Sequence, residues 1–390
     1  KKPNVPNLRF PEFKGEWEKM RLDAFTKRVM RKNKSNQSRL PLTISAQYGL
    51  VDQITFFNKV VASTDLSNYY LLKKGEFAYN KSYSSDYPWG AIKRLDNYDQ
   101  GALSSLYICF APQDNVVSDF ILQYFESPKW HKGISEIAVE GARNHGLLNV
   151  AVQDFFHTYH YVPKDKKEQI KISKLLMLLD ERIATQNKII EDLKKLKSAI
   201  IEKLYSEIQG KEYSYRQLFE IINERNNRLE FSNVLSASQE RGMVSREDLN
   251  LDIKFERSNI NTYKIVRDGD YVIHLRSFQG GFAFSNIVGV CSPAYTIMRP
   301  KDLLEYGYLS YYFTSRQFIK SLVIVTYGIR DGRSINVDEW LDMKIVIPTK
   351  EQQRHIVRTI KVFENRIENE EMYASCLLKQ KQHLLRQMFI

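Results

Sequence analysis

Two long stretches of the chain place apolar residues at alternating steps of four and three, which is the spacing of a coiled-coil seam. The first seam reads Ile172, Leu176, Leu179, Ile183, Gln186, Ile190, Leu193, Lys197, Ile200 and Leu204. The second reads Ile356, Ile360, Phe363, Ile367, Glu370, Ala374, Leu377, Lys381, Leu384 and Met388. The pattern predicts two helices of about 40 residues, each roughly 60 Å long at 1.5 Å per residue, too long for one small domain to cover.

The polar residues within the seams indicate how the two helices pair. Both seams have a polar residue at the fifth and at the eighth position. Parallel pairing in register would set Lys197 against Lys381, whereas antiparallel pairing places each lysine beside an apolar layer, where its stem can reach outward to water. We therefore predict an antiparallel two-helix coiled coil. Packing of each seam on its own domain remains the alternative.

The rest of the chain contains an internal sequence repeat. The segment Gly141-Ala142-Arg143-Asn144 recurs as Gly328-Ile329-Arg330-Asp331, and the following Asn149-Val150 recurs as Asn336-Val337. Earlier matches keep the same order: Gly49 with Gly242, Gly75 with Gly269, Gly101 with Gly289, and Pro112 with Pro300. A period of about 190 residues is far longer than the roughly 20 to 50 residues of a solenoid repeat. The chain therefore holds two similar but unequal copies of one large unit.

Each copy has the pattern of an α+β domain with a mixed sheet. Short amphipathic patterns open the copies at 17–29 and 215–224, and strand-like runs follow at 43–45 and 271–274. Helical patterns come at 117–130 and 303–318, and a last strand runs into Pro163 or Pro348. We predict a first domain at 1–163, a helix at 164–210, a second domain at 211–348 and a helix at 349–390. The copies are expected to be related by a pseudo-twofold axis.

Net charge favours a polyanionic partner. The chain carries +12, and the run Lys27, Arg28, Arg31, Lys32, Lys34 and Arg39 contains no acidic residue. Basic surfaces attract phosphates without sequence preference, although a solvated basic face is the simpler reading. Cys109, Cys291 and Cys376 show no CxxC spacing, so no disulfide framework is expected and a cytoplasmic location fits. The sequence contains no run of 18 apolar residues, so we expect no membrane span.

Two kinds of loop are candidates for contacts to DNA. The gap-free repeat around Arg143 and Arg330 reads as an exposed turn, and arginine fits guanine while asparagine fits adenine. The copies differ most between Ser82 and Gly101, where basic, hydroxyl and aromatic groups are mixed. A structural arginine remains the alternative reading. The predicted DNA-contacting residues are Lys81, Ser82, Tyr83, Lys93, Arg94, Arg143, Asn144, His145, Arg276, Ser277, Gln279, Arg330, Asp331 and Arg333.

The sequence contains few motifs that would indicate catalysis. The sequence has no GxxxxGK[ST] phosphate loop and no Asp-Pro-Pro-Tyr type motif for a flipped adenine. Asp252-Ile253-Lys254 resembles the tail of a nuclease motif, but no Pro-Asp pair precedes it. His157 and His160 form an isolated HxxH, which is more often structural than metal-binding. We predict no catalytic, cofactor-binding or metal-binding residue in this chain.

The architecture resembles the specificity subunit of type I restriction–modification systems along essentially all 390 residues. The opening Asn7-Leu8-Arg9-Phe10-Pro11 with Trp17, and Glu168-Gln169-Ile170-Lys171-Ile172 after Pro163, are similar to that family's conserved regions. Leu179-Asp180-Glu181-Arg182-Ile183 adds to the likeness, and Asn365-Arg366-Ile367 departs from it in the second copy. The second copy also has one residue more between its Glu351-Gln352 and Ile356.

The resemblance implies a function. Two target-recognition domains would each read one half of a bipartite, asymmetric site in double-stranded DNA, and the helices would set the spacing. Two modification subunits would dock on the helices, carrying S-adenosylmethionine for adenine-N6 methylation, and two restriction subunits would bring ATP and Mg²⁺. The chain itself would hold no cofactor and catalyse nothing. A free-standing nuclease with a cryptic site and a protein-binding scaffold are the alternatives.

Overall fold

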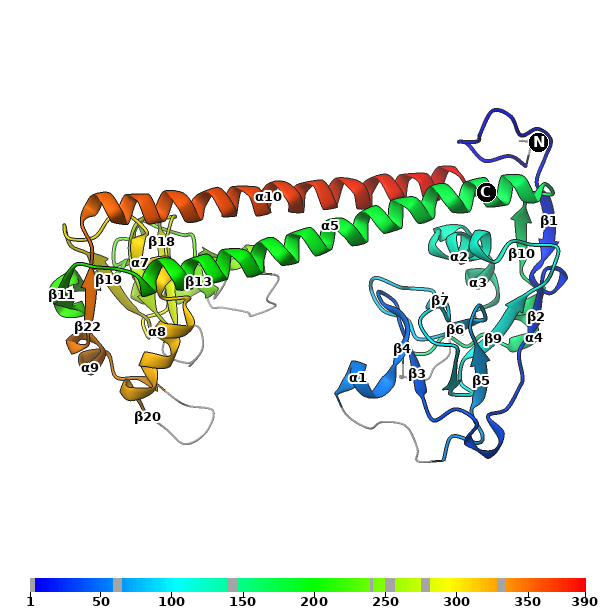
Figure 1. Cartoon of the computed structure of the whole chain (residues 1–390), viewed down its shortest axis with the longest axis horizontal. Helices are drawn as coiled ribbons and strands as arrows, with labels where there is room; N and C mark the ends of the chain where they lie inside the picture. The colour runs from blue at the N-terminus through cyan, green and yellow to red at the C-terminus, as the bar shows by residue number, and fades with distance from the viewer. Residues whose placement is uncertain are drawn as a thin grey trace. The chain divides into compact units, whose positions relative to one another are not determined.

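The computed structural model describes residues 4–58, 65–138, 146–238, 241–249, 257–274, 281–327 and 334–390. The chain divides into two compact units. The first comprises Lys1–Asn187 with Met372–Ile390, and the second comprises Lys188–Glu371. Both long helices, α5 (Lys166–Ser206) and α10 (Lys350–Gln387), therefore contribute one part to each unit (Figure 1).

The first unit contains two four-stranded sheets and one two-stranded sheet, in the orders β2-β9-β6-β7, β4-β3-β8-β5 and β1-β10. The strands are β1 (Glu18–Arg21), β2 (Thr26–Arg28), β3 (Pro41–Ser45), β4 (Gly49–Asp52), β5 (Tyr70–Lys73), β6 (Phe77–Asn80), β7 (Ala91–Arg94), β8 (Gln100–Leu103), β9 (Ile108–Pro112) and β10 (Tyr159–Val162). The short helices are α1 (Gln53–Phe57), α2 (Ser118–Glu126), α3 (His131–Ile137) and α4 (Val152–His157), with 3-10 turns at Leu22–Ala24, Lys34–Asn36 and Pro128–Trp130. Among the described strands of this unit β3 and β8 pair in parallel and the other pairs are antiparallel, so the predicted mixed sheet is confirmed.

The second unit repeats this pairing. Its sheets are β12-β19-β16-β17, β13-β14, β15-β18 and β11-β22, with an added pair β20-β21. The strands are β11 (Lys211–Ser214), β12 (Phe219–Ile222), β13 (Leu235–Ser238), β14 (Gly242–Ser245), β15 (Lys264–Val266), β16 (Tyr271–Ile273), β17 (Phe282–Phe284), β18 (Gly289–Cys291), β19 (Thr296–Pro300), β20 (Thr326–Tyr327), β21 (Ser334–Ile335) and β22 (Lys344–Ile347). The helices are α6 (Tyr215–Leu218), α7 (Tyr308–Tyr312), α8 (Arg316–Ser321) and α9 (Val337–Asp342), with 3-10 turns at Arg246–Leu249, Arg257–Thr262 and Leu322–Val325. The internal repeat is thus a repeat of strand pairing.

Close approach of β3 and β8 explains one repeated glycine. A Cβ atom on Gly101 would lie 2.4 Å from the Leu42 side chain. On the matching Gly289 it would lie 2.6 Å from the Asn233 carbonyl oxygen and 2.7 Å from Leu235. The repeat keeps glycine there because no side chain fits between the paired strands.

The opening segment of each copy was predicted as amphipathic, and the structure shows it to be mainly extended. Residues 17–29 form β1, a 3-10 turn and β2, and residues 215–224 form a single helical turn followed by β12. The apolar spacing arises because Trp17, Leu22 and Phe25 enter one core from successive short elements. Short apolar runs do not distinguish a helix from a strand by spacing alone.

The predicted seams are confirmed on both long helices. Every seam position, from Ile172 to Leu204 and from Ile356 to Met388, is buried or partly buried. Near the two helix ends, side chains one position along from the seam are also buried, namely Ile201 and Tyr205 on α5, Leu385 on α10 and Phe389 just after α10. A straight helix drifts by about 20° per heptad, so the buried stripe moves toward the neighbouring residue.

The helices run antiparallel within each unit. In the first unit Ile172 and Leu176 share a core with Leu385 and Met388. In the second unit Ile201 and Tyr205 share a core with Ile356 and Ile360. Farther along the second unit, Lys194 pairs with Glu371 at 2.7 Å. Residue numbers rise on one helix as they fall on the other, which confirms the predicted direction. The residues at the ends of each seam also belong to the domain cores. The alternative that each seam packs on its own domain therefore holds only at these ends.

The lysines in the two seams, Lys197 and Lys381, form ion pairs with carboxylates at matching positions of the facing helices. Lys197 pairs with Glu364 at 3.3 Å in the second unit, and Lys381 pairs with Asp180 in the first. Both lysines are partly buried, and each reaches a carboxylate on the facing helix. Lys197 and Lys381 occupy matching repeat positions, as do Asp180 and Glu364. Each unit therefore builds the same ion pair with the roles of the two helices exchanged.

A glutamine anchors the first turn of each long helix. Gln169 donates to the Pro163 carbonyl at 2.8 Å and accepts from the Val117 backbone at 2.7 Å. Gln353 donates to the Pro348 carbonyl at 3.0 Å and accepts from the Glu305 backbone at 2.8 Å. Gln353, not Gln352, is therefore the counterpart of Gln169. The extra residue inferred from the sequence between Glu351 and Ile356 is wrong, because the two copies differ in length between the proline and the glutamine.

His160 is a structural core residue, which agrees with the sequence interpretation. Its ring nitrogens lie 2.8 Å from the Tyr124 hydroxyl and 2.8 Å from the Thr158 hydroxyl. Burial lowers the pKa of His160 to about 3. Among the described residues no group of three or more His, Cys, Asp or Glu side chains could hold a metal ion.

Replacing His160 should change the acid stability of the first unit. The unfolded chain takes up a proton on this histidine near pH 6.5, while the folded state takes it up only near pH 3. The unfolded state binds more protons in between, so His160 lowers stability by about 1.4 kcal/mol per pH unit as pH falls. His160→Gln should remove this slope. Urea unfolding of both proteins between pH 6 and pH 4.5 measures it, and equal slopes would contradict the assignment.

Candidate nucleic-acid interface

The predicted contact loop between β6 and β7 is exposed in the first unit. Ser82 and Tyr83 face solvent, and the Tyr83 side chain is 53 % exposed. Tyr83 donates its backbone N–H to Gly146 at 2.9 Å, and Leu148 donates to Lys81 at 2.9 Å. These bonds form an antiparallel bridge between Ser82 and Leu147. The loop is therefore tied to a second segment that is distant in the sequence.

That second segment directly follows the repeated arginine turn. Arg143, Asn144 and His145 lie outside the described residues, and Gly146 begins the described part. The structure thus brings Lys81, Ser82 and Tyr83 beside Gly146–Leu148, the described residues that follow Arg143 in the chain.

The residues of the second unit that were predicted to contact DNA lie outside the described residues. Arg276, Ser277 and Gln279 connect β16 to β17, the same hairpin position as the Lys81 loop. Arg330, Asp331 and Arg333 connect β20 to β21, whose register pairs Thr326 with Ile335 and Tyr327 with Ser334. Their contact roles stay predictions.

Lys93 and Arg94 are held inside the first unit. The Lys93 ammonium lies 2.6 Å from Glu126, and its side chain is 11 % exposed. Arg94 lies 2.7 Å from Asp96 and 2.7 Å from Asp119. The β6–β7 register places Arg94 opposite Phe77, at the end of the hairpin away from the loop. We therefore assign these two cations to stabilising the domain, a role that depends on a register not visible in the sequence.

The basic run from Lys27 to Arg39 is mostly exposed, and two of its side chains, Arg31 and Lys32, have partners within the first unit. Lys27, Arg28, Lys34 and Arg39 face solvent, whereas Arg31 pairs with Glu76 at 2.7 Å. Lys32 donates to the Asn68 carbonyl at 2.8 Å and lies 4.5 Å from the Tyr70 ring. Most of the predicted positive surface therefore remains available to phosphates.

One edge of the first unit gathers the ends of three strands. The β6–β9 register pairs Tyr79 with Ile108, so β6 ends beside the β8–β9 turn. The β3–β8 register pairs Leu42 with Leu103, so the β3–β4 turn extends past the same turn. Loop ends on a rigid sheet are common places for binding residues. Tyr48, Leu106 and Leu147 lie at this edge and are exposed. Strand register and the Ser82–Leu147 bridge place them at this edge, and neither is visible in the sequence.

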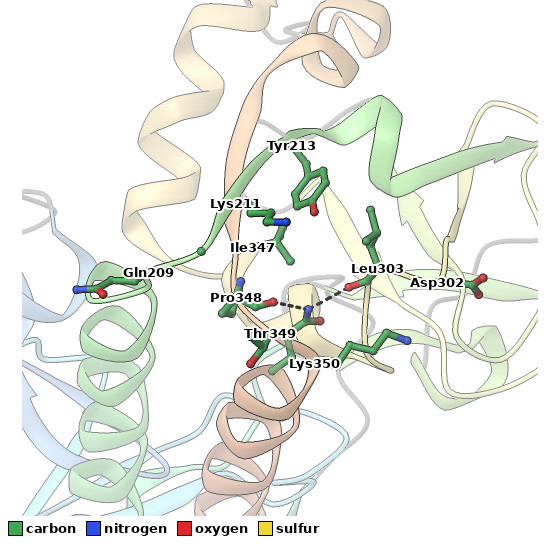
Figure 2. Close-up of a pocket in the computed structure, with 11 residues that line it drawn as sticks. Gln209, Lys211, Tyr213, Asp302, Leu303, Ile347, Pro348, Thr349 and Lys350 are labelled. Atoms are coloured by element: carbon green, nitrogen blue, oxygen red, sulfur yellow. Dashed lines mark hydrogen bonds between the residues drawn. The ribbon is translucent and has the colours of Figure 1, made fainter.

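A cavity of about 390 Å³ lies in the second unit near the start of α10 (Figure 2). Lys211, Tyr213, Asp302 and Lys350 are among its lining residues. The Gln353 amide donates to the Leu303 and Pro348 carbonyls at 3.0 Å each, shown by dashed lines in Figure 2. The Gln353 side chain in this cavity therefore anchors the first turn of α10.

The two buried cysteines, Cys109 and Cys291, are not activated nucleophiles. Burial raises the pKa of Cys109 to about 12 and that of Cys291 to about 12, so both thiols stay protonated near neutral pH. No described helix is long and apolar enough to cross a membrane.

Comparison with known proteins finds likeness in structure and not in sequence. No protein-family model matches the chain, and no curated protein matches it. A chain from a structure on complex assembly and conformational transition of the type I R-M system matches with a TM-score of 0.60 and 14% identity, covering 96% of this chain and 97% of that chain. The type I restriction-modification S subunit from M. genitalium matches with a TM-score of 0.52 and 14% identity, covering 99% of both chains. Over nearly its whole length, this chain has the α+β fold of a type I restriction–modification S subunit.

Proposed function

We propose that this chain is the DNA specificity subunit of a type I restriction–modification complex, and that each unit reads one half of a bipartite target in double-stranded DNA. The observation that carries the proposal is the duplicated unit, in which the same strand pairing recurs and a long antiparallel helix pair enters each core. A whole-chain likeness to S subunits supports it. The exposed Ser82–Tyr83 loop and the Leu147 segment bridged to it are the surface that we expect to contact bases.

The division of labour follows from the same proposal. Two modification subunits dock on the helices and transfer methyl groups from S-adenosylmethionine to adenine N6. Two restriction subunits supply ATP- and Mg²⁺-dependent translocation and cleavage. This chain determines the DNA sequence that the complex recognises and catalyses no reaction, and it works in the cytoplasm.

The methylation motif tests the function directly. The chain is co-produced with its modification subunits, and the DNA of the host is sequenced for methylated adenine. We expect a split motif with two unlike halves, because the two units differ in their loops. The gap should correspond to about one DNA turn, roughly 34 Å between half-site centres. A continuous or palindromic motif would contradict the proposal, as would cleavage or methyl transfer by the purified chain alone.

Removing either repeated arginine should affect one half-site only. If Arg143 or Arg330 binds guanine through two hydrogen bonds, its change to alanine costs about 1–3 kcal/mol and relaxes the preference at one base pair. If it binds a phosphate, affinity falls alike on all sequences and the salt slope drops by about one unit. Binding titrations at several salt concentrations distinguish these results. A variant that matches the parent in both measurements would show that the arginine is structural.

A further inference from the structure

The loop edge of the first unit is unusually apolar for a surface expected to meet DNA. Leu106 is 70 % exposed in the β8–β9 turn, and Tyr48 is 67 % exposed in the β3–β4 turn. Leu147, beside Ser82 on the bridge, is 46 % exposed. Single exposed apolar side chains are ordinary, but several at one edge mark a contact surface.

Aromatic rings extend this edge from Tyr48 onto α1. The Tyr48 ring lies 6.3 Å from Phe56, and Phe56 lies 5.1 Å from Phe57. Both phenylalanines are 44 % exposed. Asp52 fixes the start of α1 by accepting from the Ile54 backbone at 3.0 Å. The cluster is held in place by local hydrogen bonding and not by burial.

At two matching positions the second unit carries different side chains. Arg241 stands where the first unit has Tyr48, one residue before the repeated glycine. Ala294 stands where the first unit has Leu106, between the repeated serine and tyrosine. Arg241 is exposed. The two units therefore present different chemistry on the same strand framework.

Resting on the proposed function, we infer that Leu106 and Leu147 contact thymine methyl groups in the major groove of one half-site. The C5-methyl of thymine is the apolar group that base edges present in that groove, and aliphatic or aromatic side chains are its partners. The edge is continuous with the Lys81–Tyr83 loop, so methyl contacts and polar contacts fall on neighbouring base pairs.

Uracil substitution tests this inference, because uracil differs from thymine only by the methyl group. Once the motif is known, each thymine of both half-sites is replaced singly by uracil, and affinity of the assembled complex is measured at fixed salt. Loss of a buried methyl contact should weaken binding about fourfold. We expect such a loss at one or more positions of the half-site that the first unit reads.

The protein side of the cycle uses Leu106→Ala with Leu147→Ala. The double variant should bind thymine and uracil duplexes equally at the sensitive positions, because the side chains that meet the methyl groups are gone. Leu8→Ala is the matched control: this leucine is 43 % exposed, and its segment bonds to α10 through Gln387. The control complex should keep the full uracil effect.

Three results would overturn the inference. Equal affinity of the parent for thymine and uracil at every position would exclude methyl contacts. An unchanged uracil effect in the double variant would place those contacts elsewhere. Weakened assembly with the modification subunits, and intact uracil sensitivity in the complex that still forms, would make this edge a protein interface. A parent complex that fails to distinguish its motif from unrelated DNA would instead refute the proposed function, and this inference with it.

Discussion

A variant with one added heptad in both long helices is expected to recognise the same two half-sites with a wider gap between them. Seven residues add about 10 Å to a helix at 1.5 Å per residue. At 3.4 Å per base pair this lengthening corresponds to about three base pairs. Suitable insertion points are after Ile190 on α5 and at the facing level of α10, so that the seam stays in phase.

The reason for inserting whole heptads lies in the seam. Every seam position is buried or partly buried, and Lys197 and Lys381 each need a carboxylate on the facing helix. A full heptad in both helices keeps these partners, whereas a single inserted residue turns every later apolar side chain by about 100° away from the seam. The single-residue variant is therefore the control and should lose stability and assembly.

Methylated-adenine sequencing of the double-insertion protein measures the gap. Unchanged half-sites with a gap longer by about three base pairs would show that the helices set the spacing. Retained activity with an unchanged gap would show that another part of the complex sets it. The half-sites themselves serve as an internal check, because their loops are untouched.

Replacement of Glu168 by alanine is expected to destabilise the first unit by about 3 kcal/mol, the lower end of the cost of breaking a buried ion pair. Glu168 is 2 % exposed and accepts from Arg9 at 2.7 and 2.8 Å. It also accepts from the Trp17 indole at 3.1 Å. The change removes the carboxylate partner of the Arg9 guanidinium, which keeps only the Lys14 and Gly15 carbonyls, and it leaves the Trp17 indole N–H without this acceptor. Arg9 keeps some contact with water, which is the reason for choosing the lower end.

Urea unfolding followed by tryptophan fluorescence suits this measurement. Trp17, Trp89 and Trp130 lie in the first unit and only Trp340 lies in the second, so the signal reports mainly on the first unit. Glu168→Gln should be intermediate, because its amide oxygen still accepts from the indole but carries no charge. Glu12→Ala removes a surface partner of Lys171 and should leave the midpoint unchanged. A midpoint for Glu168→Ala equal to the parent's would show that the pair contributes nothing.

The comparison of sequence and structure at the loops is instructive. The sequence marked Lys81, Ser82 and Tyr83 by their composition, and the structure ties them to the segment after Arg143. It also marked Lys93 and Arg94, which the β6–β7 register and the carboxylates of Glu126, Asp96 and Asp119 hold inside the domain. Composition identifies which groups could bind a phosphate or a base. It does not identify the groups that an acidic neighbour from another element has already neutralised.

The sequence by itself determined the two long helices, their antiparallel pairing and the duplication of an α+β unit. These features rest on periodicity and repetition, which are local properties written along the chain. Only the tertiary structure decided which strands pair, which cations are internal and that Tyr48, Leu106 and Leu147 share one edge. The reason is physical: strand register is set by contacts between residues far apart in the sequence, and a shift of one residue would turn each side chain to the other face. The apolar edge exists only because β3, β6 and β8 end together.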